Sequence, residues 1–217
     1  MRFCQRVIGE ILVTSGVIVA LFLAYMYWGT AMREGDAQQR FDRELSSRWA
    51  APGLSLAMLG SPGRLVTGRP FALMRIPAFG ADWKFAIVQG TGLAQLALGP
   101  GHVPGTQRPG QVGNFAVAGH RVTAGNPFWS VPSLRPGDAV FIDTVSGTYE
   151  YKITARPVWV WPGDSAVLAP SPDRPGQRPR HAWITLITCD PAWSGTSRVV
   201  VTGLLVGKTP RYPGGGS

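Results

Sequence analysis

Residues 185–201, TLITCDPAWSGTSRVVV, indicate the fold class of this chain. The runs 185–189 and 198–201 are rich in Thr, Ile, Leu and Val, residue types that favour strands. A Pro and a Ser-Gly pair lie between the two runs and are typical of a hairpin loop. Antiparallel pairing of the two strands would bring Cys189, at the end of the first, close to Arg198, near the start of the second.

Similar β-branched and aromatic runs recur along the chain and are separated by turn signals. We expect strands at residues 72–76, 83–88, 114–118, 139–144, 149–161, 183–189 and 198–206. Residues 91–98 form the one run in this region that suits a short helix. The 28 Gly and 19 Pro residues are too many for a helical bundle and too aperiodic for collagen. The pattern therefore predicts an all-β domain, either a sandwich or a small barrel.

The charge and the metal-binding residue types limit the function. The chain has 21 Lys and Arg against 12 Asp and Glu, a net charge of +9. The Arg residues are scattered and form no stripe, so we expect no nucleic-acid partner. Two Cys residues cannot build a disulfide-rich scaffold or a four-cysteine zinc site. Three His residues leave little scope for a histidine-rich metal centre.

An uncharged segment near the N-terminus, residues 11–32, is long enough to cross a bilayer. Arg2 and Arg6 precede it, so the positive-inside rule places residues 1–10 in the cytoplasm and the rest of the chain outside. We therefore expect a transmembrane signal anchor. The alternative is a cleaved signal peptide, and both alternatives export the main domain.

The exported part divides by composition into three regions. Residues 33–70 are expected to be a stalk and linker, with a polar, helix-compatible first half and a Gly, Pro and Ser-rich second half. Residues 71–207 hold the predicted strands and form the main domain. Residues 208–217 are expected to be a flexible tail.

Cys189 is a candidate nucleophile. Cys4 lies on the predicted cytoplasmic side and cannot pair with it, and an unpaired Cys in an exported domain is a candidate reactive thiol. The alternative is that Cys189 is a small buried hydrophobic residue. Arg198 would favour a thiolate and supply donors to an oxyanion, or it is a solvated edge residue. Asp190 would oppose the thiolate, unless it pairs with an Arg.

A cysteine nucleophile also needs a proton donor and acceptor, and the chain has three histidines. His120 follows the apolar run NFAVA in NFAVAGHR, where a side chain would emerge at the rim of a barrel. His102 follows Gly-Pro-Gly in a loop, and His181 ends a Pro-rich connection at 162–181. The residues alone favour His120, and they leave open both the other two histidines and a site with no histidine.

The motifs AVAGHR and LITC, followed nine residues later by Arg198, resemble the sortases. These are membrane-anchored cysteine transpeptidases of bacterial surfaces. RIPAFGADW, GPGHVPGTQRPGQVGNFAVAGHR and LRPGD extend the resemblance in the same order, over about residues 70–206. The pattern is most similar to the actinobacterial class E sortases. It differs from them at Asp190, where another residue is more frequent, and at Ala124, where Tyr is frequent; both differences bear on substrate preference.

The resemblance implies an eight-stranded β-barrel with short helices. It makes Cys189 the nucleophile, His120 the general acid and base, and Arg198 the residue that orients the substrate and stabilises the oxyanion. His102 and His181 become non-catalytic. It implies no metal and no organic cofactor.

The implied reaction cleaves an LAXTG or LPXTG sorting signal between Thr and Gly and transfers the acyl group to an amine of the cell wall. The implied partners are exported proteins with a C-terminal sorting signal and peptidoglycan or its lipid-linked precursor. Two alternatives remain open from the residues. One is an exported cysteine hydrolase, and the other is a non-catalytic module that binds wall polymers.

Overall fold

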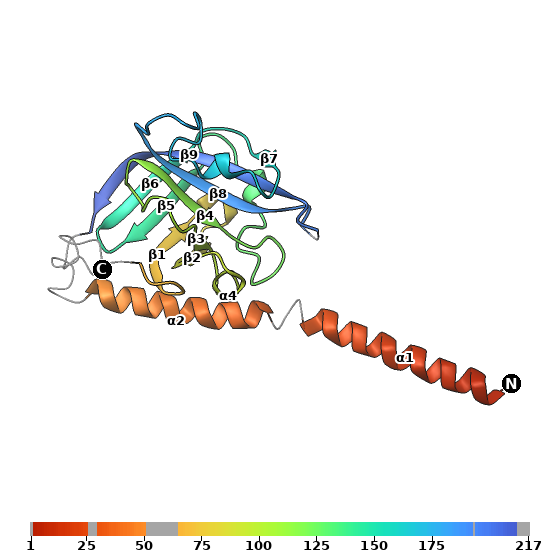
Figure 1. The fold of residues 1–217 in the computed structure, drawn as a ribbon. Helices are drawn as coiled ribbons and strands as arrows, with labels where there is room; N and C mark the ends of the chain where they lie inside the picture. The colour runs from red at the N-terminus through yellow and green to blue at the C-terminus, as the bar shows by residue number, and fades with distance from the viewer. Residues whose placement is uncertain (1, 26–29, 51–64, 193, 212–217) are drawn as a thin grey trace.

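The computed structural model describes residues 2–25, 30–50, 65–192 and 194–211. A β-barrel lies against the helix α2, and α1 extends away from both (Figure 1). The helices are α1 (Arg2–Ala24), α2 (Thr30–Ala50) and α4 (Leu93–Leu96), with short 3-10 turns η2 (Pro77–Phe79), η3 (Val131–Ser133) and η4 (Ser165–Leu168). The strands are β1 (Pro70–Arg75), β2 (Lys84–Gln89), β3 (Gly101–His102), β4 (Gly113–Ala118), β5 (Ala139–Thr144), β6 (Gly147–Ile153), β7 (Val158–Val160), β8 (Ala182–Asp190) and β9 (Ser197–Pro210).

The strands form one sheet in the order β6-β5-β1-β2-β3-β4-β8-β9-β7. A further pairing between β6 and β9 closes eight of them into a barrel. The long strand β9 makes this closure because its first half pairs with β8 and its second half with β6. The predicted fold class, an eight-stranded barrel with short helices, is confirmed.

Two differences from the predicted strands have local causes. The run 149–161 is divided into β6 and β7, and Pro157, which has no N–H to donate to a ladder, lies in the gap. The two-residue strand β3 was not predicted, because its sequence is not strand-like. It forms through its pairing with β2 and β4. The other predicted strands agree with the structure to within a few residues.

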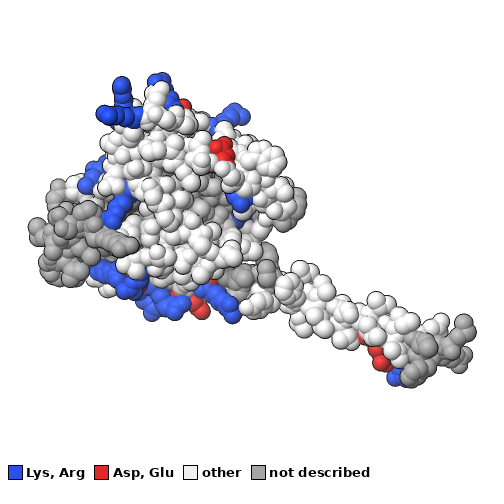
Figure 2. All heavy atoms as spheres, in the orientation of Figure 1, with Lys and Arg blue, Asp and Glu red and all other residues white. Residues whose placement is uncertain are grey.

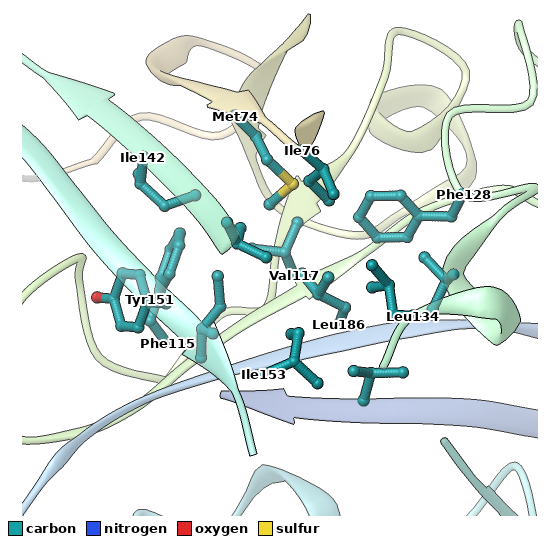
Figure 3. Close-up of a cluster of buried hydrophobic side chains, with 14 of the residues drawn as sticks. Met74, Ile76, Phe115, Val117, Phe128, Leu134, Ile142, Tyr151, Ile153 and Leu186 are labelled. Carbon is teal, nitrogen blue, oxygen red and sulfur yellow. The ribbon is translucent and has the colours of Figure 1, made fainter. Parts of the chain in front are cut away.

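The barrel interior is apolar and tightly filled. Figure 3 shows side chains from several strands meeting there, among them Met74, Phe115, Ile142 and Leu186, all of which are fully buried. Tyr151 is buried with them, and its hydroxyl accepts a hydrogen bond of 2.7 Å from Gly110 N. The buried phenolic oxygen of Tyr151 therefore has a hydrogen-bond partner.

The segment 33–50, which we expected to be a stalk, lies on the barrel as part of α2. Leu45 is buried against Leu73 and Ala86. The Gln38 side chain accepts a hydrogen bond of 2.6 Å from Ala86 N and donates one of 2.7 Å to Leu98 O. The contact between α2 and the barrel was not predicted from the sequence, because the apolar stripe of the helix is narrow and its other faces are polar. Most of the linker predicted to follow it lies outside the described residues.

The flexible tail expected at 208–217 is wrong for its first residues, 208–211. β9 continues to Pro210, where it pairs with Gly147. The next residue, Arg211, donates to Thr144 O at 3.2 Å, and its guanidinium lies 4.2 Å from the centre of the Trp49 ring. Residues 212–217 are outside the described part of the chain.

Helix α1 contains a stretch, Gln5–Ala24, that is long and apolar enough to cross a membrane. None of it is buried against the rest of the protein. Figure 2 shows α1 almost free of charged side chains except near its start, where Arg6 pairs with Glu10. The predicted anchor at 11–32 overlaps this helix, and residues 26–29 within that range lie outside the described residues.

Candidate active site

Cys189 and Arg198 are direct partners across the β8–β9 hairpin, as the sequence predicts. Both are partly buried. The Arg198 guanidinium is held in place, because its Nη1 donates to Gly195 O at 2.7 Å and to Ser197 O at 2.9 Å. Gly195 has φ +61, and a Cβ there would contact both Cys189 Sγ and Arg198 Nη1 at 3.6 Å. The thiol and the guanidinium therefore border the same small space at the rim of the barrel.

His120 reaches the same rim from the other side of β8. β4 and β8 run parallel, and Ala118 is level with Ile187 in their last paired position. The alignment continues beyond the ladder, because Gly119 N donates to Ile187 O at 3.0 Å and Thr188 Oγ1 donates to Gly119 O at 2.9 Å. Continuing this register places His120 level with Cys189. The structure thus brings the three predicted site residues to one end of three adjacent segments.

The imidazole of His120 is half-buried, and burial lowers its pKa below the ordinary value of 6.5. The ring is therefore mostly neutral near neutral pH and able to accept a proton. Its backbone is fixed, because the carbonyl accepts a hydrogen bond of 3.1 Å from Phe128 N.

The other two histidines are placed differently. His102 is buried, with Nδ1 2.6 Å from Gln89 Oε1 and Nε2 3.0 Å from Gln107 O, so both ring nitrogens already have partners. Burial also lowers its pKa. His181 is exposed and precedes the start of β8, at the opposite end of that strand from Cys189. The two residues are eight positions apart along an extended chain, a separation of about 26 Å.

Asp190, whose effect on the thiol the sequence left open, is paired. Its Oδ1 forms an ion pair with Arg121 Nη1, and its Oδ2 accepts a hydrogen bond of 2.9 Å from Trp159 Nε1. The Arg121 guanidinium also lies 5.8 Å from the centre of the Trp129 ring. Arg121 was not predicted as a site residue, and the one sequence signal for it is its position directly after His120.

Among the described residues, no group of three His, Cys, Asp or Glu side chains is arranged to hold a metal ion. The absence of a cofactor stays a prediction.

The Sortase domain family model matches residues 74–206 of this chain. The chain belongs to the sortase family. Members of this family are cysteine transpeptidases. This chain is 32% identical to Sortase SrtE1 of Streptomyces coelicolor. The match covers 97% of this chain, which spans 59% of the length of that relative. The chain is 27% identical to Sortase SrtE2 of the same organism, covering 92% of this chain and 81% of the relative.

Solved structures of sortases agree with this assignment. Sortase E from Streptomyces avermitilis aligns with a TM-score of 0.61 and 39% identity, covering 67% of this chain and 93% of that one. Sortase E1 from Streptomyces coelicolor, solved with a tripeptide in the active site, aligns with a TM-score of 0.61 and 33% identity over 69% and 96% of the two chains. The resemblance to class E sortases is therefore confirmed.

The loop that follows His120 in this sortase rests on a buried carboxyl group of α2. Glu34 is 4% exposed, and its Oε1 has no hydrogen-bond partner among the described residues. A Cβ at Gly125, which has φ +70, would overlap Glu34 Oε2. Burial raises the pKa of Glu34 to about 8.

Glu34→Gln is expected to stabilise the fold, increasingly so as the pH rises. The folded chain keeps a proton that the unfolded chain releases above its ordinary pKa of 4.5, so stability is lost between pH 4.5 and about 8. Gln has the same shape and no charge, so the gain at pH 7 is at most about 3 kcal/mol. Thermal unfolding of the full chain in detergent at several pH values measures it.

The matched control for this variant is Asp36→Asn, which changes an exposed carboxylate two positions along the same helix. It should shift the unfolding temperature little at any pH, because exposed charges contribute little to stability. A Glu34→Gln chain whose gain in stability is the same at pH 4 and pH 8 would contradict the prediction.

Proposed function

We propose that this chain is a transpeptidase that cleaves an LAXTG or LPXTG sorting signal between Thr and Gly and transfers the acyl group to a cell-wall amine. The observation that supports it is the meeting of Cys189, His120 and Arg198 at one rim of the barrel. A thiol, an imidazole and a guanidinium are the three groups that acyl transfer through a thioester requires. Family membership supports the same chemistry.

The first half-reaction forms the thioester. The Cys189 thiolate attacks the Thr carbonyl carbon, and the carbonyl oxygen becomes an oxyanion that receives a hydrogen bond from Arg198. The carbon–nitrogen bond then breaks, and the protonated imidazole of His120 gives its proton to the leaving Gly amine. The second half-reaction reverses these roles: an acceptor amine attacks the thioester, His120 takes its proton, and the Cys189 thiolate leaves. One covalent intermediate between two half-reactions predicts ping-pong kinetics.

We further propose that α1 anchors the chain in the cell membrane, with residues 1–10 in the cytoplasm and the barrel outside. The apolar length of α1 and the positive charges at its start support this orientation. The substrates would then be exported proteins with a C-terminal sorting signal. The acceptor would be an amine of peptidoglycan or of its lipid-linked precursor.

Intact-mass and peptide-mapping spectrometry of the full chain in detergent tests the function. The chain is mixed with LAETG and LPETG peptides, with and without a stem-peptide amine. We expect an acyl adduct on the Cys189 peptide, none on the Cys4 peptide, and a ligated product when the amine is present. Cleavage without any ligated product would identify a hydrolase. A folded chain with no adduct from either peptide and an unreactive Cys189 would identify a non-catalytic module.

Arg198→Ala is expected to lower kcat/KM for transpeptidation by about 10²- to 10³-fold, because it removes a fixed donor to the oxyanion. Arg198→Lys should recover only part of this loss, since an ammonium group cannot reproduce the guanidinium fork that Gly195 O and Ser197 O hold in place. Steady-state kinetics measure both. An Arg198→Ala enzyme within threefold of wild type would show that Arg198 takes no part in the step.

A further inference from the structure

The two residues that directly follow His120 and Cys189 form an ion pair with each other. Arg121 follows His120, Asp190 follows Cys189, and their side chains are only 18% and 24% exposed. The hydrogen-bonded ladder between β4 and β8 ends at Ala118 and Ile187, so this ion pair joins the two segments beyond the end of the ladder.

Two tryptophans complete what we call the Asp190 cluster, which consists of Asp190, Arg121, Trp159 and Trp129. Trp159 Nε1 donates to the carboxylate oxygen that Arg121 does not use, so both oxygens of Asp190 have partners. Trp129 lies against the Arg121 guanidinium at 5.8 Å. The indoles of Trp159 and Trp129 are more than half exposed, so the cluster lies at the surface of the rim rather than in the barrel core.

The cluster matters because a carboxylate next to a thiol disfavours the thiolate. The charged and titratable groups placed around Cys189 are Asp190 on its own strand, His120 and Arg121 after β4, and Arg198 on β9. Without Arg121, Asp190 would remain a partly buried and unbalanced negative charge in the chain position next to the nucleophile. Its other partner, the indole of Trp159, carries no charge.

We propose that Arg121 is a positioning residue, which neutralises Asp190 so that Cys189 ionises and which holds the end of β4 so that His120 stays level with Cys189. This proposal rests on the proposed function, since it needs Cys189 to be the nucleophile. It assigns a role to two residues outside the three that carry out the chemistry.

The test measures the rate at which iodoacetamide alkylates Cys189 in the full chain in detergent, from about pH 5 to about pH 9, with the site mapped by mass spectrometry. Arg121→Ala should move the midpoint of the rate profile upward by about one pH unit, which slows alkylation about tenfold below the midpoint. Asp190→Asn should move the midpoint downward, because it removes the negative charge and leaves the guanidinium. Arg121→Ala/Asp190→Asn should return it close to the wild-type position.

Two further variants separate this role from a merely structural one. Arg121→Lys keeps the charge and should keep the midpoint, even where it lowers the unfolding temperature. Arg178→Ala removes an exposed Arg near the start of β8, the end opposite Cys189, and should leave the midpoint unchanged. If Arg121→Ala does not fold, the downward shift expected for Asp190→Asn and the unchanged midpoint expected for Arg121→Lys still decide the matter.

An unchanged or lowered midpoint in Arg121→Ala, or an unchanged midpoint in Asp190→Asn, would overturn the proposal. Alkylation needs no peptide, so the result is independent of whether the sorting-signal peptides are substrates. A chain that shows the expected order of midpoints and forms no acyl adduct would refute the proposed function and keep the electrostatic role of Arg121. A chain that ligates peptides, and whose variants all share the wild-type midpoint, would support the proposed function and refute the electrostatic role of Arg121.

Discussion

Cys189→Ala is expected to abolish peptide cleavage and transpeptidation, a loss of about 10⁴-fold or more in kcat. The thiol is the group that forms the covalent intermediate, and alanine has no atom that can replace it. The partner Arg198 lies on a strand paired with β8 and does not depend on the thiol for its place, so the fold should be unaffected. Product formation with LAETG peptide and an amine, followed by mass spectrometry, measures the loss.

The matched control is Cys4→Ala, which removes the chain's other cysteine, in α1. It should retain the wild-type rate in detergent. Cys189→Ser should be nearly as inactive as Cys189→Ala, because a hydroxyl ionises far less readily than a thiol. Turnover by Cys189→Ala above a few per cent of wild type would mean that another residue attacks the substrate.

The sequence predicted well those parts of the site that depend on neighbouring residues. The β8–β9 hairpin lies within one short stretch, so its strand residues and its loop fix the pairing of Cys189 with Arg198 locally. The parallel pairing of β4 with β8 is different, because it joins segments about 70 residues apart and no local pattern specifies it. The residues favoured His120 without excluding the other two histidines, and the resemblance to the sortases then assigned the role to His120.

The features that the sequence did not predict are contacts between distant, ordinary-looking residues. Arg121 and Asp190 are each one charge in a chain with many, and their pairing depends on the β4–β8 register. Glu34 lies in a polar helix where nothing in the sequence distinguishes it from Asp36 or Glu44. It is buried because α2 docks on the barrel and presents this residue to the loop at Gly125.

His120→Gln is expected to lower kcat/KM by about 10³-fold and to change the shape of its pH profile. The amide cannot accept or donate a proton at neutral pH, so the step that expels the Gly amine loses its acid. The wild-type profile should be bell-shaped, with limbs that belong to the coupled thiol and imidazole rather than to either alone. In the variant only the thiolate is still required, so the profile should rise with pH to a plateau.

The control is His181→Gln, which replaces an exposed histidine at the far end of β8 and should stay within twofold of wild type. Added imidazole should partly restore a His120→Ala enzyme, because the lost ring is half-buried and leaves a space open to solvent. Burial lowers the pKa of His120, so the protonated ring is the minor form near neutral pH, and proton donation uses that minor form. A bell-shaped profile that survives in His120→Gln would show that the titrating acid is a different group, and the assignment of His120 would then be wrong.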